Sequence, residues 1–350
     1  MHLNKKKVNK QIYQQNHKAM NKIISKEQFS EKVFKLEIEA PLIAKSRRAG
    51  HFVIVRVDEK GERMPLTIAG SNLEKGTITL VVQTVGLSST KLCKLNEGDY
   101  VLDVVGPLGQ ATHIQNYGTV VCAGGGVGVA PMLPIIQALK AAGNRVISVL
   151  AGRSKDLIIL EEEVRASSDE VIIMTDDGSY GTKGLVTEGI ESVIKREKVD
   201  KCFAIGPAIM MKFCCLLTKK YEIPTDVSLN TIMVDGTGMC GACRITVGGK
   251  TKFVCVDGPE FDGHQVDFDE MFKRMGSFKD VEREEMSHLE QHVCKVEPQA
   301  EAKESECKPC SEKACQMPME ELLDRKAPWR EELRKAMKPK ERTAIHRCPM

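Results

Sequence analysis

The stretch GTVVCAGGGVGVAPMLPIIQALKAAGN, residues 118–144, decides the fold class of this chain. An apolar run ending at Ala123 is typical of a buried β-strand, glycines follow it, and apolar residues then recur at helical spacing. A strand, a tight glycine turn and a helix in this order bring backbone N–H groups to the start of the helix, where they bind a pyrophosphate. The stretch therefore predicts a nucleotide-binding turn at Gly124, Gly125, Gly126 and Gly128, although the same glycines can also form a plain turn.

Downstream of this stretch, strand-like and helical segments alternate. RVISVLAG (145–152) and DEVIIMTDDG (169–178) are typical of strands, VTEGIESVIKREK (186–198) is helical, and residues 201–220 combine a strand with a helix. This alternation predicts a parallel sheet with crossover helices over residues 114–227. The apolar setting predicts that four cysteines there are buried thiols: Cys122, Cys202, Cys214 and Cys215.

Upstream, residues 20–113 have a different pattern. Short runs rich in Val and Ile alternate with polar residues and are separated by Gly, Pro and Asn; the clearest are KVFKLEIEA (32–40), GHFVIVRVDE (50–59), GTITLVVQTVG (76–86) and GDYVLDVVGPLG (98–109). Several short strands at this spacing predict a small antiparallel barrel. Residues 1–19 are basic and lack such a pattern, so they are expected to form a disordered leader, and Met20 is an alternative start.

Length and composition bound the remaining possibilities. A chain of 350 residues has room for two or three domains. The net charge of +3 gives no argument for a nucleic-acid partner, and no apolar run has the length of a membrane span, so a cytoplasmic location is expected. Thirteen cysteines without a secretion signal favour metal ligands and buried thiols over a disulfide scaffold.

A metal site is indicated by DGTGMCGACR, residues 235–244. Cys240 and Cys243 are separated by two residues in a glycine-rich loop, and eleven residues separate Cys243 from Cys255. A ferredoxin-type [2Fe–2S] site needs the spacing C-x4-C-x2-C with a more distant fourth cysteine, and position 235, where the first would stand, is Asp. The loop therefore favours an iron–sulfur site in a small domain over residues 228–270; a zinc ribbon and unliganded cysteines are the alternatives.

Residues 271–350 are charged and include the low-complexity stretch KVEPQAEAKESECKPCSEKACQ (295–316), which is typical of a linker or an extended arm. Cys307, Cys310 and Cys315 lie within it, and their spacing leaves a second metal site open.

The order of these segments resembles the ferredoxin-NADP reductase superfamily, through a barrel followed by AGGGVGVAP (123–131) and IGPAIMMK (205–212). The resemblance implies FAD in the barrel and a nicotinamide nucleotide in the α/β domain. RMPLTIAG (63–70) resembles the family's flavin motif and VGLSST (85–90) its pyrophosphate turn. The implied FAD contacts are Arg63, Pro65, Leu66 and Thr67, and Gly86, Ser88, Ser89 and Thr90.

For the nicotinamide nucleotide, the implied contacts besides the glycine turn are Arg153, Asp177, Gly206 and Pro207. Arg153 suits a 2′-phosphate or is only a solvated loop residue, and the paired acids Asp176 and Asp177 either line the same cleft or serve only as turn formers. NAD(H) and NADP(H) therefore both stay open as the nucleotide.

With the cysteine loop added, the chain resembles the small subunits of NADH-dependent reduced ferredoxin:NADP oxidoreductases, also known as sulfide dehydrogenase small subunits. They are related to the electron-transfer subunits of class B dihydroorotate dehydrogenase. In the former group an Asp replaces the first cysteine, which implies the ligand set Asp235, Cys240, Cys243 and Cys255.

The resemblance implies a subunit that moves electrons between NAD(P)H, FAD and the [2Fe–2S] cluster, in a bifurcating ferredoxin:NADP oxidoreductase. The implied partner is a glutamate-synthase-like large flavoprotein subunit, through which ferredoxin is reached, because DRKAPWREELRKAMKPKERTAIHRCPM (324–350) resembles the start of that subunit. Service to a dihydroorotate dehydrogenase or to a sulfide or polysulfide reductase is the alternative within this class. A zinc-binding nucleotide sensor is the alternative from another class. No side chain is expected to act as a catalytic acid or base.

Overall fold

The structure is a computed structural model that describes residues 21–284, 286 and 287. All of these residues belong to one compact unit, residues 1–295. The expected leader over residues 1–19 lies outside the described residues, and so do Cys307, Cys310, Cys315 and the rest of the tail from residue 288.

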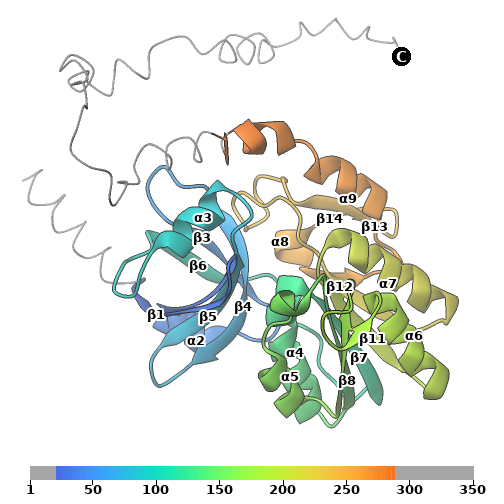
Figure 1. Ribbon diagram of the computed structural model, residues 1–350. Helices are drawn as coiled ribbons and strands as arrows, with labels where there is room; N and C mark the ends of the chain where they lie inside the picture. Colours follow the sequence, from blue (N-terminus) through green and yellow to red (C-terminus); the bar gives the residue numbers. More distant parts are fainter. Residues whose placement is uncertain (1–20, 285, 288–350) are drawn as a thin grey trace, which may run out of the picture. The chain divides into compact units, whose positions relative to one another are not determined.

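The first part of the chain forms a six-stranded antiparallel sheet (Figure 1). Its order is β1 (Ile23–Ser30), β2 (Val33–Glu39), β5 (Thr77–Gln83), β4 (Met64–Asn72), β3 (Phe52–Arg56) and β6 (Asp103–Leu108). Lys22 forms a bridge with Tyr100, and the N–H of Ile23 donates to the carbonyl of Asp99 at 2.9 Å. These contacts bring the start of β1 against the segment that precedes β6, so the two edges of the sheet approach each other as in the predicted barrel. Two helices accompany it, α2 (Pro41–Ser46) and α3 (Leu87–Lys94).

Strand register explains the interior of this sheet. In the antiparallel pairing of β2 with β5, Leu36 lies opposite Leu80, and Ile38 lies opposite Ile78. Side chains two residues apart share a face, and all four of these are fully buried. The apolar alternation in the sequence therefore becomes the core of the barrel.

The second part is a seven-stranded sheet, ordered β10-β9-β8-β7-β11-β12-β15 and parallel up to β12. Its strands are β7 (Thr119–Gly125), β8 (Arg145–Gly152), β9 (Glu170–Thr175), β10 (Thr182–Lys183), β11 (Lys201–Ile205), β12 (Thr225–Ser228) and β15 (Glu260–Asp262). Two 3-10 turns belong to it, η1 (Gly126–Gly128) and η2 (Lys155–Leu157). Helices α4 (Val129–Ala141) and α5 (Glu161–Ser167) cover one face, and α6 (Val186–Arg196) and α7 (Ala208–Lys220) cover the other (Figure 1). The predicted α/β fold with crossover helices is confirmed.

The cysteine-bearing segment is built from a hairpin and short helices: β13 (Arg244–Val247), β14 (Lys250–Phe253), α8 (Val254–Asp257) and α9 (Phe268–Met275). Between α8 and α9 the chain forms β15, which pairs antiparallel with β12. This segment thus contributes an edge strand to the nucleotide sheet. The domain boundaries at residues 113, 227 and 270 stay a proposal.

The cysteines expected to be buried thiols are buried. Cys122, Cys202 and Cys214 are fully buried, and Cys215 is 5% exposed. Burial raises the pKa of the Cys202 thiol to about 12. These cysteines pack in the cores on the two faces of the α/β sheet, so they act as small apolar side chains.

Candidate functional site

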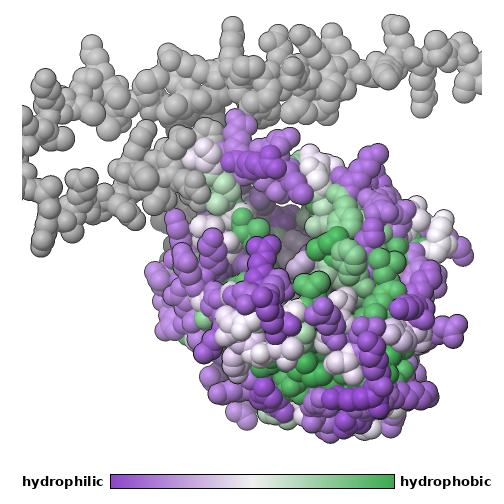
Figure 2. Space-filling model, turned by 45° about the vertical axis from the view of Figure 1, so that its right-hand side comes forward, coloured by the Kyte–Doolittle hydropathy of each residue, from purple (hydrophilic) through white to green (hydrophobic). Residues whose placement is uncertain are grey.

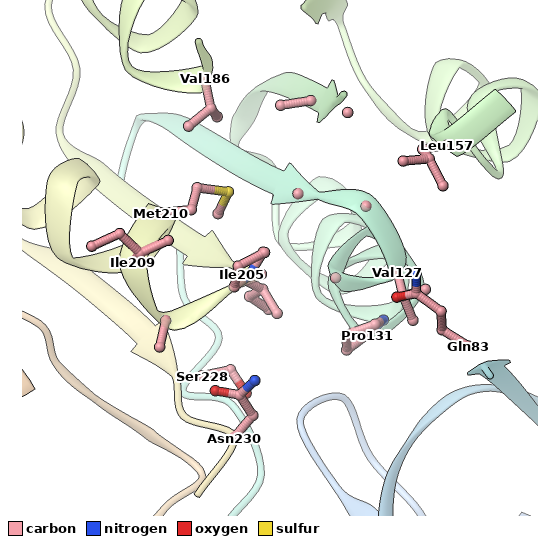
Figure 3. Close-up of a pocket in the computed structure, with 18 of the residues that line it drawn as sticks. Gln83, Val127, Pro131, Leu157, Val186, Ile205, Ile209, Met210, Ser228 and Asn230 are labelled. Carbon is pink, nitrogen blue, oxygen red and sulfur yellow. The ribbon is translucent and has the colours of Figure 1, made fainter. Parts of the chain in front are cut away.

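A cavity of about 1030 Å³ lies between the barrel and the carboxyl ends of the parallel strands. This is the edge of an open α/β sheet where ligands bind, and the volume suits a cofactor. Nine residues predicted as cofactor contacts line it: Pro65, Leu66, Thr67, Gly125, Gly126, Gly128, Arg153, Gly206 and Pro207. Figure 3 shows Gln83 of β5 beside Val127 and Pro131, so the barrel meets the glycine turn at this cavity.

Close packing leaves no room for a side chain at Gly124 and Gly128, and the backbone conformation disfavours one at Gly126. A Cβ atom at Gly128 would lie 2.7 Å from Cα of Gly206, because the turn packs directly on the end of β11. Gly126 has a φ of +53°, and a Cβ there would meet no atom within 4 Å. The turn therefore presents bare backbone to the cavity at the start of α4, where a helix N-terminus favours an anion. Gly124 lies behind the turn, where a Cβ would meet Cε of Met132 at 2.7 Å.

On the flavin side, Pro65, Leu66 and Thr67 are consecutive residues of β4. Sequence reasoning missed their neighbours Val33, Val81 and Gln83, which also line the cavity. Which residues of β2, β5 and β4 face the cavity depends on how these three strands pair. The order of the strands along the chain does not reveal this pairing.

The predicted pyrophosphate turn lies at the start of α3, with Gly86 as the residue before the helix. The Ser89 hydroxyl accepts from the N–H groups of Val85 and Gly86, both at 3.0 Å. The Ser88 hydroxyl donates to the carboxylate of Glu62 at 2.7 Å. Gly86, Ser88, Ser89 and Thr90 lie outside the lining of the cavity, so their contact with a pyrophosphate stays a prediction.

On the nucleotide side, Arg153 follows β8 and Asp176 follows β9, and both line the cavity. The predicted contact Asp177 lies outside the lining; its carboxylate accepts from the N–H of Ser179 at 2.8 Å. The hydrogen bonds with Ser179 hold the pKa of Asp177 below its usual value. Asp177 thus closes a turn in the structure, and its role as a nucleotide contact stays a prediction.

Ser228, Leu229 and Asn230 also line the cavity, and no sequence motif pointed to them. They follow β12, at the point where the chain leaves the parallel sheet for the cysteine-bearing segment. Figure 3 shows Ser228 and Asn230 next to each other. The cavity is therefore lined by all three parts of the described chain.

The four predicted cluster ligands lie in two pairs. The Cys240 thiol lies 3.3 Å from a carboxylate oxygen of Asp235, and the Cys243 sulfur lies 3.2 Å from the Cys255 sulfur. A [2Fe–2S] cluster has two irons with two protein ligands each, so one pair suits each iron. Among the described residues, no three His, Cys, Asp or Glu side chains are gathered closely enough to hold a single metal ion.

Backbone N–H groups point at these ligands. Ala242 donates to the sulfur of Cys240 at 3.4 Å, and Cys255 donates to the sulfur of Cys243 at 3.5 Å. Such donors stabilise sulfur that carries negative charge in a bound cluster. The donor set of three thiols and a carboxylate, with N–H groups around it, therefore fits an iron–sulfur cluster.

The protonation of the ligands follows from their surroundings. Burial raises the pKa of the Cys255 thiol to about 12, and the neighbouring Cys243 adds to the rise. For Asp235, burial raises the pKa, but hydrogen bonds from the N–H of Thr237 and the thiol of Cys240 outweigh it and lower the pKa to about 2. A bound metal deprotonates its thiol ligands, so Cys255 would lose its proton if it held a cluster.

Arg63 lies outside the lining of the cavity. Its Nε donates to the carbonyl of Val234 at 2.8 Å, and its Nη2 donates to the carbonyl of Asp235 at 3.2 Å. The guanidinium thus faces the segment that carries the predicted cluster ligands, residues 234–258, which we call the cluster loop. The role of Arg63 as a phosphate ligand stays a prediction.

The chain is similar to known proteins both in its cysteine-bearing segment and over most of its length. The model of the iron–sulfur cluster binding domain of dihydroorotate dehydrogenase B matches residues 230–267. A Thermotoga maritima homologue of the electron transfer subunit of dihydroorotate dehydrogenase B (NAD(+)) is 50% identical over 265 residues, 76% of this chain and 94% of the relative. An uncharacterized protein from the adh 3′ region of Clostridium beijerinckii is 46% identical over 284 residues, 78% of this chain and 95% of the relative.

A solved structure is similar over the same region. It comes from a study of flavin-based electron bifurcation in the NADH-dependent reduced ferredoxin-NADP oxidoreductase. It is 47% identical with a TM-score of 0.75, and the match covers 77% of this chain and 98% of that one. Among the described residues, no helix is long and apolar enough to cross a membrane.

Proposed function

Since the chain belongs to the family of electron transfer subunits of dihydroorotate dehydrogenase B and their homologues, we propose that it is an electron-transfer flavoprotein subunit. It moves electrons between NAD(P)H, FAD and a [2Fe–2S] cluster and delivers them to a larger flavoprotein. The observation that carries this proposal is the cavity that joins β4 of the barrel, the glycine turn and the segment leading to the cluster loop.

The residues of the cavity bind and orient the two nucleotides. The bare turn at Gly125, Gly126 and Gly128 receives a pyrophosphate, and Thr67 places a hydroxyl at the flavin side. The apolar remainder of the wall, including Val81 of β5, excludes water. When bound, flavin takes up a hydride and gives up its electrons singly, and an iron–sulfur cluster carries one electron, which side chains cannot do.

The cluster loop holds its group at the surface. Asp235 and Cys240 would hold one iron, and Cys243 and Cys255 the other. Cys243 and Cys255 are each 1% exposed, whereas Cys240 is exposed and its neighbour Met239 is 88% exposed. One side of the loop is thus buried towards the chain's own core, and the other is accessible to a partner.

The proposed partner is the glutamate-synthase-like large subunit of a bifurcating ferredoxin:NADP oxidoreductase. The structure that is 47% identical comes from a study of flavin-based electron bifurcation in the NADH-dependent reduced ferredoxin-NADP oxidoreductase and matches this chain over 98% of its own length, which supports the choice. Several relatives carry the name of dihydroorotate dehydrogenase B electron transfer subunits, at 31 to 33% identity, so a dihydroorotate dehydrogenase is the second candidate partner. A sulfide or polysulfide reductase stays a further alternative.

The test is to purify the full chain with an affinity tag from its native host under anaerobic conditions. The proposal predicts FAD, two irons per chain and a co-purifying large flavoprotein. A dihydroorotate dehydrogenase catalytic subunit in its place would overturn the choice of partner. A colourless chain that carries zinc would overturn the function itself.

A further inference from the structure

Arg63 of the barrel part forms hydrogen bonds with the backbone of the cluster loop at Asp235 and the residue before it. Arg63 stands directly before β4 and donates from Nε to the carbonyl of Val234, at 2.8 Å, and from Nη2 to the carbonyl of Asp235, at 3.2 Å. These are consecutive carbonyls, and the second belongs to a proposed iron ligand. A planar guanidinium that donates along two directions fixes both the position and the orientation of this backbone.

Gln110 of the barrel part forms hydrogen bonds with the cluster loop just after Cys255. Gln110 follows β6, and its backbone N–H donates to the carbonyl of Gly258 at 2.6 Å. Its side-chain Nε2 donates to the carbonyl of Val256 at 2.9 Å. Val256 is the residue next to Cys255. The hydrogen bonds of Gln110 therefore lie beside the last proposed ligand, and those of Arg63 lie beside the first, Asp235.

Between these two sets of hydrogen bonds, the backbone of the cluster loop packs directly against side chains of the barrel. Gly236 is buried with a φ of +77°, and a Cβ there would lie 2.7 Å from Cγ1 of Ile54 and 3.0 Å from Cδ1 of Leu108. Ile54 belongs to β3 and Leu108 to β6. Only a glycine permits this approach, so the loop cannot shift towards or away from the barrel without losing these contacts.

Strand β4 connects this contact to the flavin side of the cavity. Arg63 is two residues before Pro65, the first of the three β4 residues that line the cavity. A displacement of the strand would therefore move the cavity wall and the Asp235 carbonyl together. An extended strand has a fixed rise per residue. The distance between the cavity wall and the cluster loop is therefore set by β4.

We propose that Arg63 and Gln110 are positioning residues that fasten the two ligand-bearing ends of the cluster loop to the barrel and thereby set the geometry between flavin and cluster. The inference rests on the proposed function, since it concerns the same two groups. It assigns to Arg63 a role on the loop rather than at a phosphate.

The experiment compares three full-length variants with the wild type: Arg63→Met, Arg63→Lys and Gln110→Ala. Arg47→Met is the matched control, because Arg47 also lies in the barrel part and its Nε donates to the hydroxyl of Ser71 at 2.8 Å, away from the loop. Two readouts are taken on each protein: hydrogen exchange of the amides of residues 234–243 and 255–258, and electron transfer from NADH-reduced flavin to the cluster by stopped flow.

Arg63→Met is expected to speed exchange in residues 234–243 and to slow flavin-to-cluster transfer about tenfold, since misplacement of reacting groups by about 1 Å has effects of this size or larger. In Gln110→Ala, which changes a residue outside the lining of the cavity, hydride uptake from NADH should stay at the wild-type rate. Arg63→Lys should fall between Met and wild type, because Lys keeps the charge but not the fork. Gln110→Ala should speed exchange chiefly in residues 255–258, and it supplies the same comparison if Arg63→Met does not fold.

The inference is overturned if the Arg63 and Gln110 variants match Arg47→Met in both exchange and transfer rate. It is also overturned if Arg63→Met lowers only the FAD content, since that is the result for a phosphate ligand. Failure of the proposed function is distinguishable from failure of this inference. In the first case the wild-type chain would lack FAD or iron, while hydrogen exchange in the variants would still show whether Arg63 and Gln110 hold the cluster loop.

Discussion

At the scale of single residues, Glu260 is a half-buried carboxyl group at the edge of the nucleotide sheet. It lies on β15, and one of its oxygens accepts from the Thr112 hydroxyl at 2.6 Å. Burial raises its pKa from the usual 4.5 to about 7; the Thr112 hydrogen bond and the charge of Lys201 oppose the rise, and Asp226 adds to it. The folded chain therefore holds a proton on Glu260 between these two pH values, and the unfolded chain does not.

Glu260→Gln is predicted to flatten the pH dependence of stability. In the wild type, the contribution of this group is full below pH 4.5 and is lost as the pH rises through about 7, so unfolding becomes easier across that window. The amide keeps an acceptor for Thr112 without a charge, so the variant should be the more stable protein above this window, by about 3 kcal/mol at most.

Urea denaturation of both proteins at several pH values measures this effect. The exposed Glu74→Gln is the matched control, and it should reproduce the wild-type slope. An equal pH slope in Glu260→Gln and the wild type would contradict the assignment.

Asp235 is the residue that separates this loop from an all-cysteine site. Its carboxylate also accepts from the N–H groups of Met239 and Cys240, at 2.9 and 3.1 Å. Asp235→Cys is predicted to keep its iron and to shift the visible and EPR spectra towards those of four-cysteine [2Fe–2S] proteins, because a thiolate donates more charge to iron. Spectra identical to those of the wild type and of Asp269→Cys, which adds an exposed thiol far along the chain, would show that Asp235 is not a ligand.

At the scale of elements, the unit of β7, the glycine turn and α4 depends on backbone contacts that tolerate no side chain. Gly128→Ala would push a methyl group into Gly206 and the end of β11. The variant is predicted to bind NADH about tenfold more weakly, which is about 1.4 kcal/mol, while FAD content stays at the wild-type level. Gly276→Ala is the matched control, since a Cβ there makes only ordinary contacts, 3.4 Å from the nearest atom.

Equilibrium titration of both glycine variants with NADH measures this difference. Equal dissociation constants for Gly128→Ala and Gly276→Ala would contradict the placement of the nucleotide over the turn.

The elements that the sequence predicts best are those with a strong local signal. The turn at Gly124 to Gly128 stands between an apolar strand and an apolar helix, and the spacing of Cys240, Cys243 and Cys255 carries its own chemistry. By contrast, β15 has three residues, too few for any periodicity, and its place in the nucleotide sheet depends on tertiary pairing with β12. Short edge strands of this kind are decided by packing.

At the scale of the whole molecule, contacts between distant segments lie beyond sequence reasoning. Arg63 and Asp235 are 172 residues apart, and the flavin motif gave no hint that its arginine touches the cluster loop. The lining by Ser228 and Asn230 is hidden for the same reason, since both follow a strand whose position in the sheet had to be known first. The order of the domains along the chain indicated which groups the protein binds, and the folded structure shows that the barrel part both lines the cavity and donates hydrogen bonds to the segment that carries the cysteines.

The central claim is that one chain passes electrons from a nicotinamide nucleotide through FAD to a [2Fe–2S] cluster. It is tested most directly by anaerobic titration of the purified full chain with NADH and, separately, NADPH, followed by visible and EPR spectroscopy. We expect one of the two nucleotides to bleach the flavin band and to produce the EPR signal of one reduced cluster per chain. A flavin that is bleached without any cluster signal, or a chain that neither nucleotide reduces, would contradict it.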